Sequence, residues 1–118
     1  MADEMDQNQF EGQDLDALYQ ATIDEQRAHL VQLQDDFNKI SAEAKEKAQG
    51  KLKAVPKEDK KAQEDVLLEQ KATLEVALKD LKSKVDNSTR QIMKKLEVIN
   101  TEREKRVLSD LERQIESL

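Results

Sequence analysis

The chain has 118 residues, of which 39% are charged, a formal net charge of −6 and only three aromatic side chains. There are too few bulky apolar residues for a compact globular core of the usual kind, and the composition is typical of coiled coils and other long-helix assemblies. Because the sequence contains no cysteine, disulfides and thiolate metal sites are excluded.

The charge is distributed unevenly along the chain. Residues 1–36 carry ten acidic side chains and one arginine, a net charge of −9, which leaves +3 for the remainder. This asymmetry favours a fold in which the acidic first third lies beside something basic. The acidic, polar N-terminus has the pattern of neither a signal nor a transit peptide, and no stretch approaches the roughly 18 apolar residues that span a bilayer. We therefore expect a cytoplasmic protein without a transmembrane segment.

The first predicted element follows an acidic segment, residues 1–13, that we interpret as a flexible N-terminal arm. A helix over 14–49 is predicted to begin with Asp14 as its N-cap and Asp16 in its first turn, where unpaired backbone amides favour negative charge. Its apolar positions follow a heptad, the pattern of coiled-coil packing, in which Gln26 is the one polar member and would fix the register. The heptad positions are Tyr19, Ile23, Gln26, Leu30, Leu33, Phe37, Ile40 and Ala44.

A short connection over 50–55 is predicted to follow. Gly50 is a natural left-handed stop for a helix, and Pro56 suits the first position of a new one, with Glu58 and Asp59 in its first turn. Such a short connection predicts two antiparallel helices.

The second helix is predicted over 56–118, and from Glu64 onward it contains neither glycine nor proline. Apolar residues that repeat every eleven positions, or three turns, stay on one side of the helix if it is straight or forms a slightly right-handed supercoil. One apolar series recurs every eleven residues, namely Leu74, Val85, Leu96, Val107 and Leu118. A second series fills the seam between them, namely Leu78, Leu81, Ile92, Ile99, Leu108, Leu111 and Ile115.

Residues 86–89, with the sequence Asp-Asn-Ser-Thr, leave two folds open because these residue types form helices poorly and cap them well. If the chain turns here, it forms a three-helix bundle. If it does not, it forms an antiparallel two-helix coiled-coil hairpin with a long second helix. The absence of glycine and proline, and the register that continues from Val85 to Leu96, favour the all-α hairpin.

In the hairpin, the end of the second helix extends past the first and its apolar side chains have no partner in the chain. These residues are predicted to bind protein: Val107, Leu108, Leu111, Ile115 and Leu118. Full burial of each would recover roughly 1.5–3 kcal/mol. The expected partner is another copy of this chain, which would make the protein a dimer or other homo-oligomer, or a second helical protein in a complex.

Few residues are suited to catalysis or cofactor binding. The one histidine, His29, is interpreted as a solvated flank residue, and two glycines cannot build a phosphate loop or a nucleophile elbow. We therefore do not expect the protein to be an enzyme, to hold a metal ion or a cofactor, or to have a small-molecule substrate. Lysines near the connection offer a possible anion-binding tip: Lys51, Lys53, Lys57, Lys60 and Lys61. Acidic residues lie among these lysines, and no aromatic side chains are present there to stack on bases, so the pattern does not favour nucleic-acid binding.

These patterns predict a non-catalytic protein-protein interaction module, acting as a coiled-coil adaptor, an assembly subunit or a binding chaperone. The alternatives are a structural spacer or stalk component and, third, an anion or nucleic-acid binder. In outline, a helical hairpin of this size resembles prefoldin-type subunits and the small helical chaperones and stalk proteins of bacterial export systems. The β-hairpin segments of prefoldin have no counterpart here, because residues 50–56 are too short, and no site residues are carried over.

Overall fold

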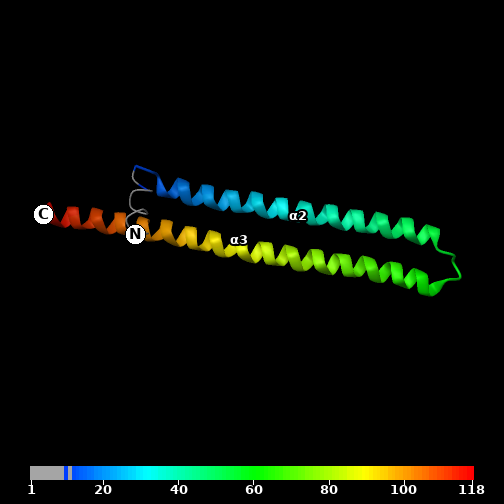
Figure 1. Ribbon diagram of the computed structural model, residues 1–118. Coiled ribbons are helices and arrows are strands. Elements are labelled where there is room, and N and C mark those ends of the chain that lie inside the picture. The colour runs from blue at the N-terminus through cyan, green and yellow to red at the C-terminus, as the bar shows by residue number, and fades with distance from the viewer. Residues whose placement is uncertain (1–9, 11) are drawn as a thin grey trace. The chain divides into compact units, whose positions relative to one another are not determined.

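The computed structural model describes residues 10 and 12–118, which form two long helices, α2 (Leu15–Ala54) and α3 (Lys60–Glu116) (Figure 1). The described chain divides into two compact units. Unit 1 contains the described residues up to Ala28 together with Ser88–Leu118, and unit 2 contains His29–Asn87. Each unit therefore consists of one stretch of α2 packed against one stretch of α3.

The two helices run antiparallel, as the contacts within each unit show. In unit 1, Asp16 contacts Arg103 and Gln26 contacts Ser88, so residue numbers rise along α2 as they fall along α3. In unit 2, residues 55–59 connect the helices, and Lys51 contacts Glu69 near this connection. The predicted all-α helical hairpin with a long second helix is thus confirmed.

The start of α2 is set by Asp14. Its side-chain oxygen Oδ1 accepts hydrogen bonds from the backbone amides of Asp16 (3.0 Å) and Ala17 (3.2 Å). These amides belong to the first turn, where no carbonyl of the helix itself can pair with them, so an aspartate in this position stabilises the helix start. The predicted N-cap is confirmed, and Leu15 is the first helical residue.

The end of α2 differs from the prediction, because the helix continues through Gly50 to Ala54. Gly50 is not in the left-handed conformation that a helix stop requires; among the described residues only Gly12 has a positive φ, at 73°. Leu52 and Val55 beyond it are half-buried, and Val55 donates a backbone hydrogen bond to Leu52. A glycine inside a helix costs roughly 0.5–1 kcal/mol relative to alanine, which is less than burial of these two side chains contributes.

The start of α3 also differs from the prediction. Pro56 does not open the helix but begins a turn, in which its carbonyl accepts the amide of Asp59 (3.0 Å). Asp59 then caps α3 through its Oδ1, which accepts the amide of Ala62 (3.0 Å). An aspartate cap and a proline turn satisfy more backbone groups than proline alone in the first helical position, so α3 begins at Lys60.

α3 continues without a break through Asp86–Thr89, so the alternative three-helix bundle with a turn at 86–89 is wrong. The structure gives a reason for the poor helix formers at this point. The Ser88 hydroxyl donates a hydrogen bond of 2.7 Å to Oε1 of Gln26, and both residues are half-buried between the helices. The polar member of the α2 seam therefore has a polar partner on α3.

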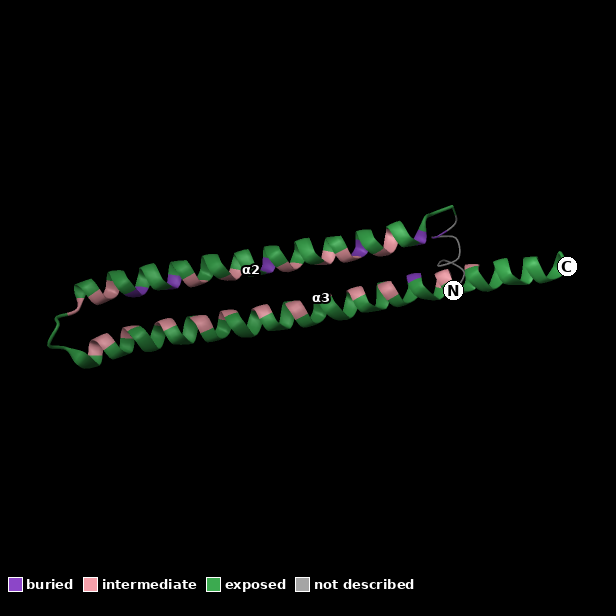
Figure 2. Cartoon of the chain, turned by 180° about the vertical axis from the view of Figure 1, so that it is seen from behind, coloured by how far each residue is buried: buried purple, intermediate pink, exposed green. Residues whose placement is uncertain are grey.

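The inward faces of both helices repeat every eleven residues. On α3, the buried or half-buried positions include Val66, Ala77, Ser88 and Ile99. On α2, the corresponding positions are Thr22, Leu33 and Ala44, and the spacing continues to the half-buried Val55 just after the helix. In Figure 2 these buried and half-buried residues follow one side of each helix. The spacing of 3.67 residues per turn keeps each face from drifting around its helix.

The heptad predicted for α2 is therefore wrong as a repeat, although it names several inward residues correctly. Thr22 is 1% exposed, and its hydroxyl donates to the carbonyl of Leu18, which satisfies it without a partner on α3. Ile40 is 40% exposed, and the half-buried residue at that turn is Ser41. On α3, Leu74, Val85 and Leu96 are half-buried as predicted. Of the second apolar series, Ile99 is fully buried and Leu78 is 51% exposed.

We predict that Ser88→Ala destabilises the protein relative to Thr89→Ala by about 1 kcal/mol, since it leaves the half-buried Gln26 amide oxygen without this donor. Thr89 is the exposed neighbour on the same turn, so its variant reports what alanine contributes to the helix alone. Urea unfolding followed by circular dichroism measures both. Equal unfolding free energies for the two variants would contradict a stabilising role for the Gln26 contact.

Candidate protein-binding surface

Unit 1 contains a small apolar cluster on the covered part of α3. Ile99 is fully buried, and it packs with Phe10 (3% exposed) and Leu15 (5% exposed). Leu18 and Tyr19 of α2 pack against this cluster. Phe10 lies within the segment 1–13 that was expected to be a flexible arm; residues 1–9 and 11 of that segment lie outside the described residues. The described part of the arm therefore contributes a core side chain.

Two arginines attach the start of the described chain to α3. Arg103 pairs with the carboxylate of Asp16 (2.7 Å) and lies over the Tyr19 ring, 5.1 Å from its centroid. Arg106 donates hydrogen bonds to the backbone carbonyls of Gln13 (2.8 Å) and Phe10. Both arginines are half-buried, so α3 is covered as far as Arg106. The uncovered end of the helix therefore begins at residue 107.

All five residues predicted to bind protein lie on this uncovered end, and we call them the C-terminal stripe. Their exposed fractions range from 48% to 104%; they are Val107 (58%), Leu108 (59%), Leu111 (48%), Ile115 (67%) and Leu118 (104%). Figure 2 shows the last turns of α3 as exposed throughout. The structure thus places these side chains together in solvent, while their role in binding stays a prediction.

Three residues of the C-terminal stripe, Leu108, Leu111 and Ile115, lie off the face of α3 that packs on α2, whereas Val107 and Leu118 continue the series of the half-buried Leu96. At about 100° per residue, Leu111 lies about 120° around the helix from the buried Ile99, and Ile115 about 160°. Met93 shares the angular position of Leu111, about 120° from Ile99, because the two residues are separated by about five full turns of the helix. It is 64% exposed, and its place beside the stripe could not be predicted from sequence because it lies outside both apolar series. Leu108, Leu111 and Ile115 therefore lie on a different side of α3 from Ile99.

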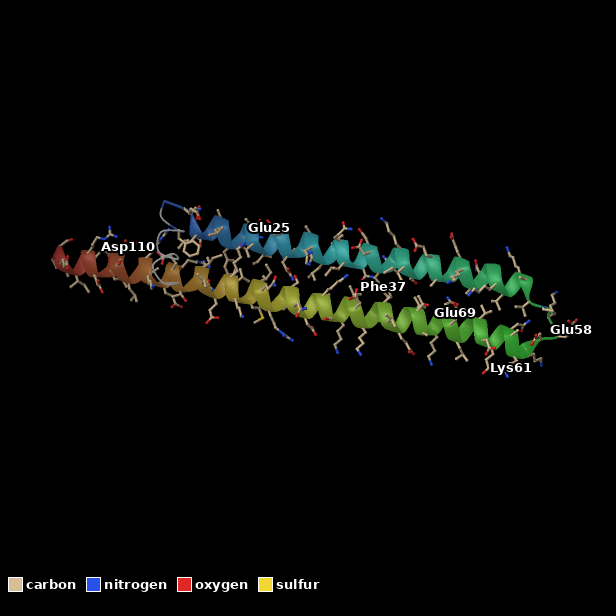
Figure 3. The ribbon with its side chains drawn as sticks, in the orientation of Figure 1. Glu25, Phe37, Glu58, Lys61, Glu69 and Asp110 are labelled. Atoms are coloured by element: carbon tan, nitrogen blue, oxygen red, sulfur yellow. The ribbon has the colours of Figure 1, made fainter. Side chains whose placement is uncertain are left out.

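The lysines of the possible anion-binding tip do not form one group. Lys51 donates both contacts of a two-oxygen interaction with the Glu69 carboxylate, at 2.8 and 2.9 Å. Lys53, Lys57, Lys60 and Lys61 are exposed. Two acidic residues, Glu58 and Asp59, lie between them in the connection, and Figure 3 shows Glu58 and Lys61 at the same end. Anion binding through these lysines is therefore opposed by neighbouring carboxylates.

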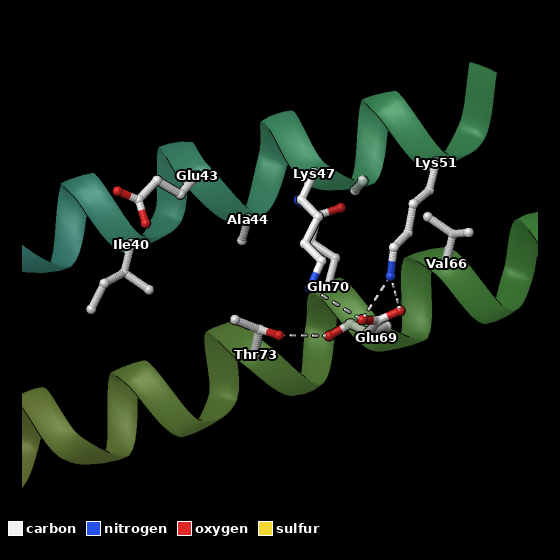
Figure 4. Close-up of a pocket in the computed structure, with 10 residues that line it drawn as sticks. Ile40, Glu43, Ala44, Lys47, Lys51, Val66, Glu69, Gln70 and Thr73 are labelled. Carbon is white, nitrogen blue, oxygen red and sulfur yellow. Dashed lines mark hydrogen bonds and ion pairs between the residues drawn. The ribbon is translucent and has the colours of Figure 1, made fainter. Parts of the chain in front are cut away.

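Two lysines, drawn beside it in Figure 4, lower the pKa of the Glu69 carboxylate. The hydrogen bond from Lys51, together with the positive charge of that lysine, lowers its pKa below the ordinary value of 4.5, and the Lys47 ammonium, 3.7 Å away, lowers it further. The carboxylate is half exposed, so solvent screens these interactions. This cluster joins the two helices of unit 2 near the connection.

His29 is exposed, and no group of three or more histidine, cysteine or acidic residues in the described chain could hold a metal ion. Among the helices of the described chain, none is long and apolar enough to cross a membrane. Comparison of the chain with protein-family models, with curated proteins and with solved structures found no match. Candidate functions therefore rest on the surfaces described above.

We predict that Glu69→Gln lowers the thermal unfolding midpoint at pH 7 and has little effect well below pH 4.5. The folded-state pKa is lowered, so the stabilisation by the carboxylate is complete above its ordinary pKa and is lost as the pH falls through the lowered value. The matched control is Glu64→Gln, at an exposed position of the same helix. A Glu69→Gln effect that is the same at both pH values would contradict this assignment.

We predict that the protein passes through a heparin column without retention at near-physiological salt. Four exposed lysines with two carboxylates among them attract a polyanion weakly, and salt screens the attraction. If the protein is instead retained, and the double variant Lys57→Glu with Lys60→Glu is not, the result would support the anion-binding tip.

Proposed function

We propose that this chain is a non-catalytic protein-protein interaction module that binds a helix of its partner through the C-terminal stripe. It would act as an adaptor, an assembly subunit or a binding chaperone, with the cytoplasm as the expected compartment. The observation that carries the proposal is the exposure of all five stripe residues on a helix end beyond the contacts of α2.

The spacing of the stripe supports a helical partner. Leu108, Leu111, Ile115 and Leu118 alternate steps of three and four residues, which is the pattern by which amphipathic helices bind in grooves or pair with other helices. Leaving these side chains in water forgoes roughly 1.5–3 kcal/mol for each that a partner could fully bury. An exposed apolar surface of this regularity, on an otherwise highly charged chain, favours a binding role.

The angular position of the stripe also supports this role. The stripe lies beyond Arg106, and Leu108, Leu111 and Ile115 lie on a different side of α3 from Ile99, so a partner helix can contact them without displacing Phe10, Leu15 or the contacts of Arg103 and Arg106. Binding would then add apolar contacts without breaking existing ones, which favours affinity because little conformational rearrangement is required.

We predict that Leu108→Glu with Leu111→Glu abolishes capture of the partner from extracts of the source cells, while helix content by circular dichroism is unchanged. The charges are placed on exposed side chains, so they prevent apolar contact with a partner and leave the fold intact.

The matched control is Val31→Glu with Val76→Glu, which places the same charges at positions that are 60% and 70% exposed in unit 2. Partners captured equally by the wild type and the control, and lost only with the stripe variant, would support the proposal. Capture unchanged by the stripe variant would contradict it and favour a structural spacer.

A further inference from the structure

The side of α3 that carries Leu108, Leu111 and Ile115 is also open where the helix lies beside the start of α2. At about 100° per residue, Glu104 lies within about 40° of all three around the helix, and its side chain is exposed. A partner helix can therefore lie along residues 103–116, all of which are helical. At a rise of about 1.5 Å per residue, this contact would be about 20 Å long.

One edge of this side carries a charge of each sign. Lys105 and Glu112 are seven residues apart, so they lie within about 20° of each other around the helix, and both are exposed. In a heptad whose a and d positions are Leu108 and Leu111, both charged residues occupy e positions. Charges at these positions set the partner and the orientation of paired helices. A helix that presents the same two charges in reverse order would therefore complement this edge.

A second copy of the same helix, turned around, presents the charges in this reverse order. If Leu108 of each copy lies opposite Leu111 of the other, the two helices are related by a twofold axis between residues 109 and 110. In an antiparallel pair the two e edges meet on the same side of the seam. Lys105 of each copy is then offset from Glu112 of the other by only two residues, about 3 Å along the axis. The pairing thus creates two opposite-charge contacts.

The same alignment fills a hollow in unit 1. Leu111 of each copy would pack among Glu104, Val107 and Leu108 of the other, on the side of the seam away from the e edge. These three residues line an open hollow of about 540 Å³, which the single chain leaves empty of side chains. Its full lining is Asn100, Arg103, Glu104, Val107 and Leu108. The hollow therefore offers a place for an apolar side chain of a partner helix beside the stripe.

Other alignments of two stripes are less favourable. An antiparallel pair shifted by one heptad sets Leu108 opposite Leu118, which follows the end of α3, and leaves Lys105 without a facing helix. A parallel pair sets residues of the same number together, so the two Glu104 side chains would meet in the seam. Like charges in a seam oppose pairing, because the seam removes them from water.

We propose that the C-terminal stripes of two copies of this chain pair antiparallel, with Leu108 of each copy opposite Leu111 of the other. This inference rests on the proposed function, because it names the partner of the same stripe. The contact uses the same surface on both copies, so association closes at a dimer. The seam is short, and Glu104 of each copy faces Ile115 of the other, which places the contact among weak, concentration-dependent interfaces.

The first test is sedimentation velocity of the full chain over a hundredfold range of protein concentration. We expect the wild type to pass from monomer to dimer as concentration rises, and Leu108→Glu with Leu111→Glu to stay monomeric. The control is Val31→Glu with Val76→Glu, which leaves the stripe intact and should dimerise as the wild type does. All four positions are exposed, and circular dichroism establishes that each variant keeps its helix content.

The second test examines the alignment with the charges of the e edge. Lys105→Glu or Glu112→Lys alone turns both opposite-charge contacts into like-charge contacts, so each should raise the dimer dissociation constant on the order of tenfold. The two substitutions together exchange the signs and restore both contacts, so the double variant should dimerise as the wild type does. Unchanged dimerisation in both single variants, or no recovery in the double variant, would overturn the antiparallel alignment.

Two outcomes of the first test would overturn self-pairing of the stripes. One is a Leu108→Glu with Leu111→Glu variant that dimerises as the wild type does, since the dimer would then use another surface. The other is a wild type that stays monomeric at every concentration. In that case the capture experiment decides the proposed function separately, because it reports binding of a different protein through the stripe.

Discussion

The eleven-residue spacing of inward residues on both helices is the constraint on which the rest of the structure depends. A chain with so few bulky apolar residues cannot build a thick core, so each helix must keep a narrow apolar face turned toward the other over its whole covered length. Val66, Ala77, Ser88 and Ile99 mark that face on α3. Because the face does not drift, α3 needs no turn or kink, and apolar residues that lie off it are left in solvent.

Much of the fold could be predicted from particular residues. Leu74, Val85 and Leu96 carried the register through the poor helix formers at 86–89, and Asp14 marked the start of α2. The unpartnered helix end could be located because apolar residues continue after the first helix has no more residues to cover them. What binds there could not be predicted in the same way, because binding depends on contacts outside a single copy of the chain.

Other features could not be predicted, because they depend on tertiary contacts. A heptad and an eleven-residue repeat share their first few positions, so only packing distinguishes Thr22 and Ser41 from Ile23 and Ile40 as the better-covered residues. Gly50 is a strong stop in isolation, but the half-buried Leu52 and Val55 hold the helix beyond it. Phe10 is covered because Arg106 binds the backbone beside it.

The Gln26–Ser88 hydrogen bond has a consequence for how the hairpin finds its alignment during folding. Two helices with the same repeat can also pair after sliding past one another by one repeat, because apolar positions would again meet apolar positions. Such a slipped state would leave the Gln26 amide and the Ser88 hydroxyl against apolar side chains, without each other as partners. One polar layer thus penalises the misaligned pairings that the periodic apolar faces tolerate, and it makes the native alignment the preferred outcome of collapse.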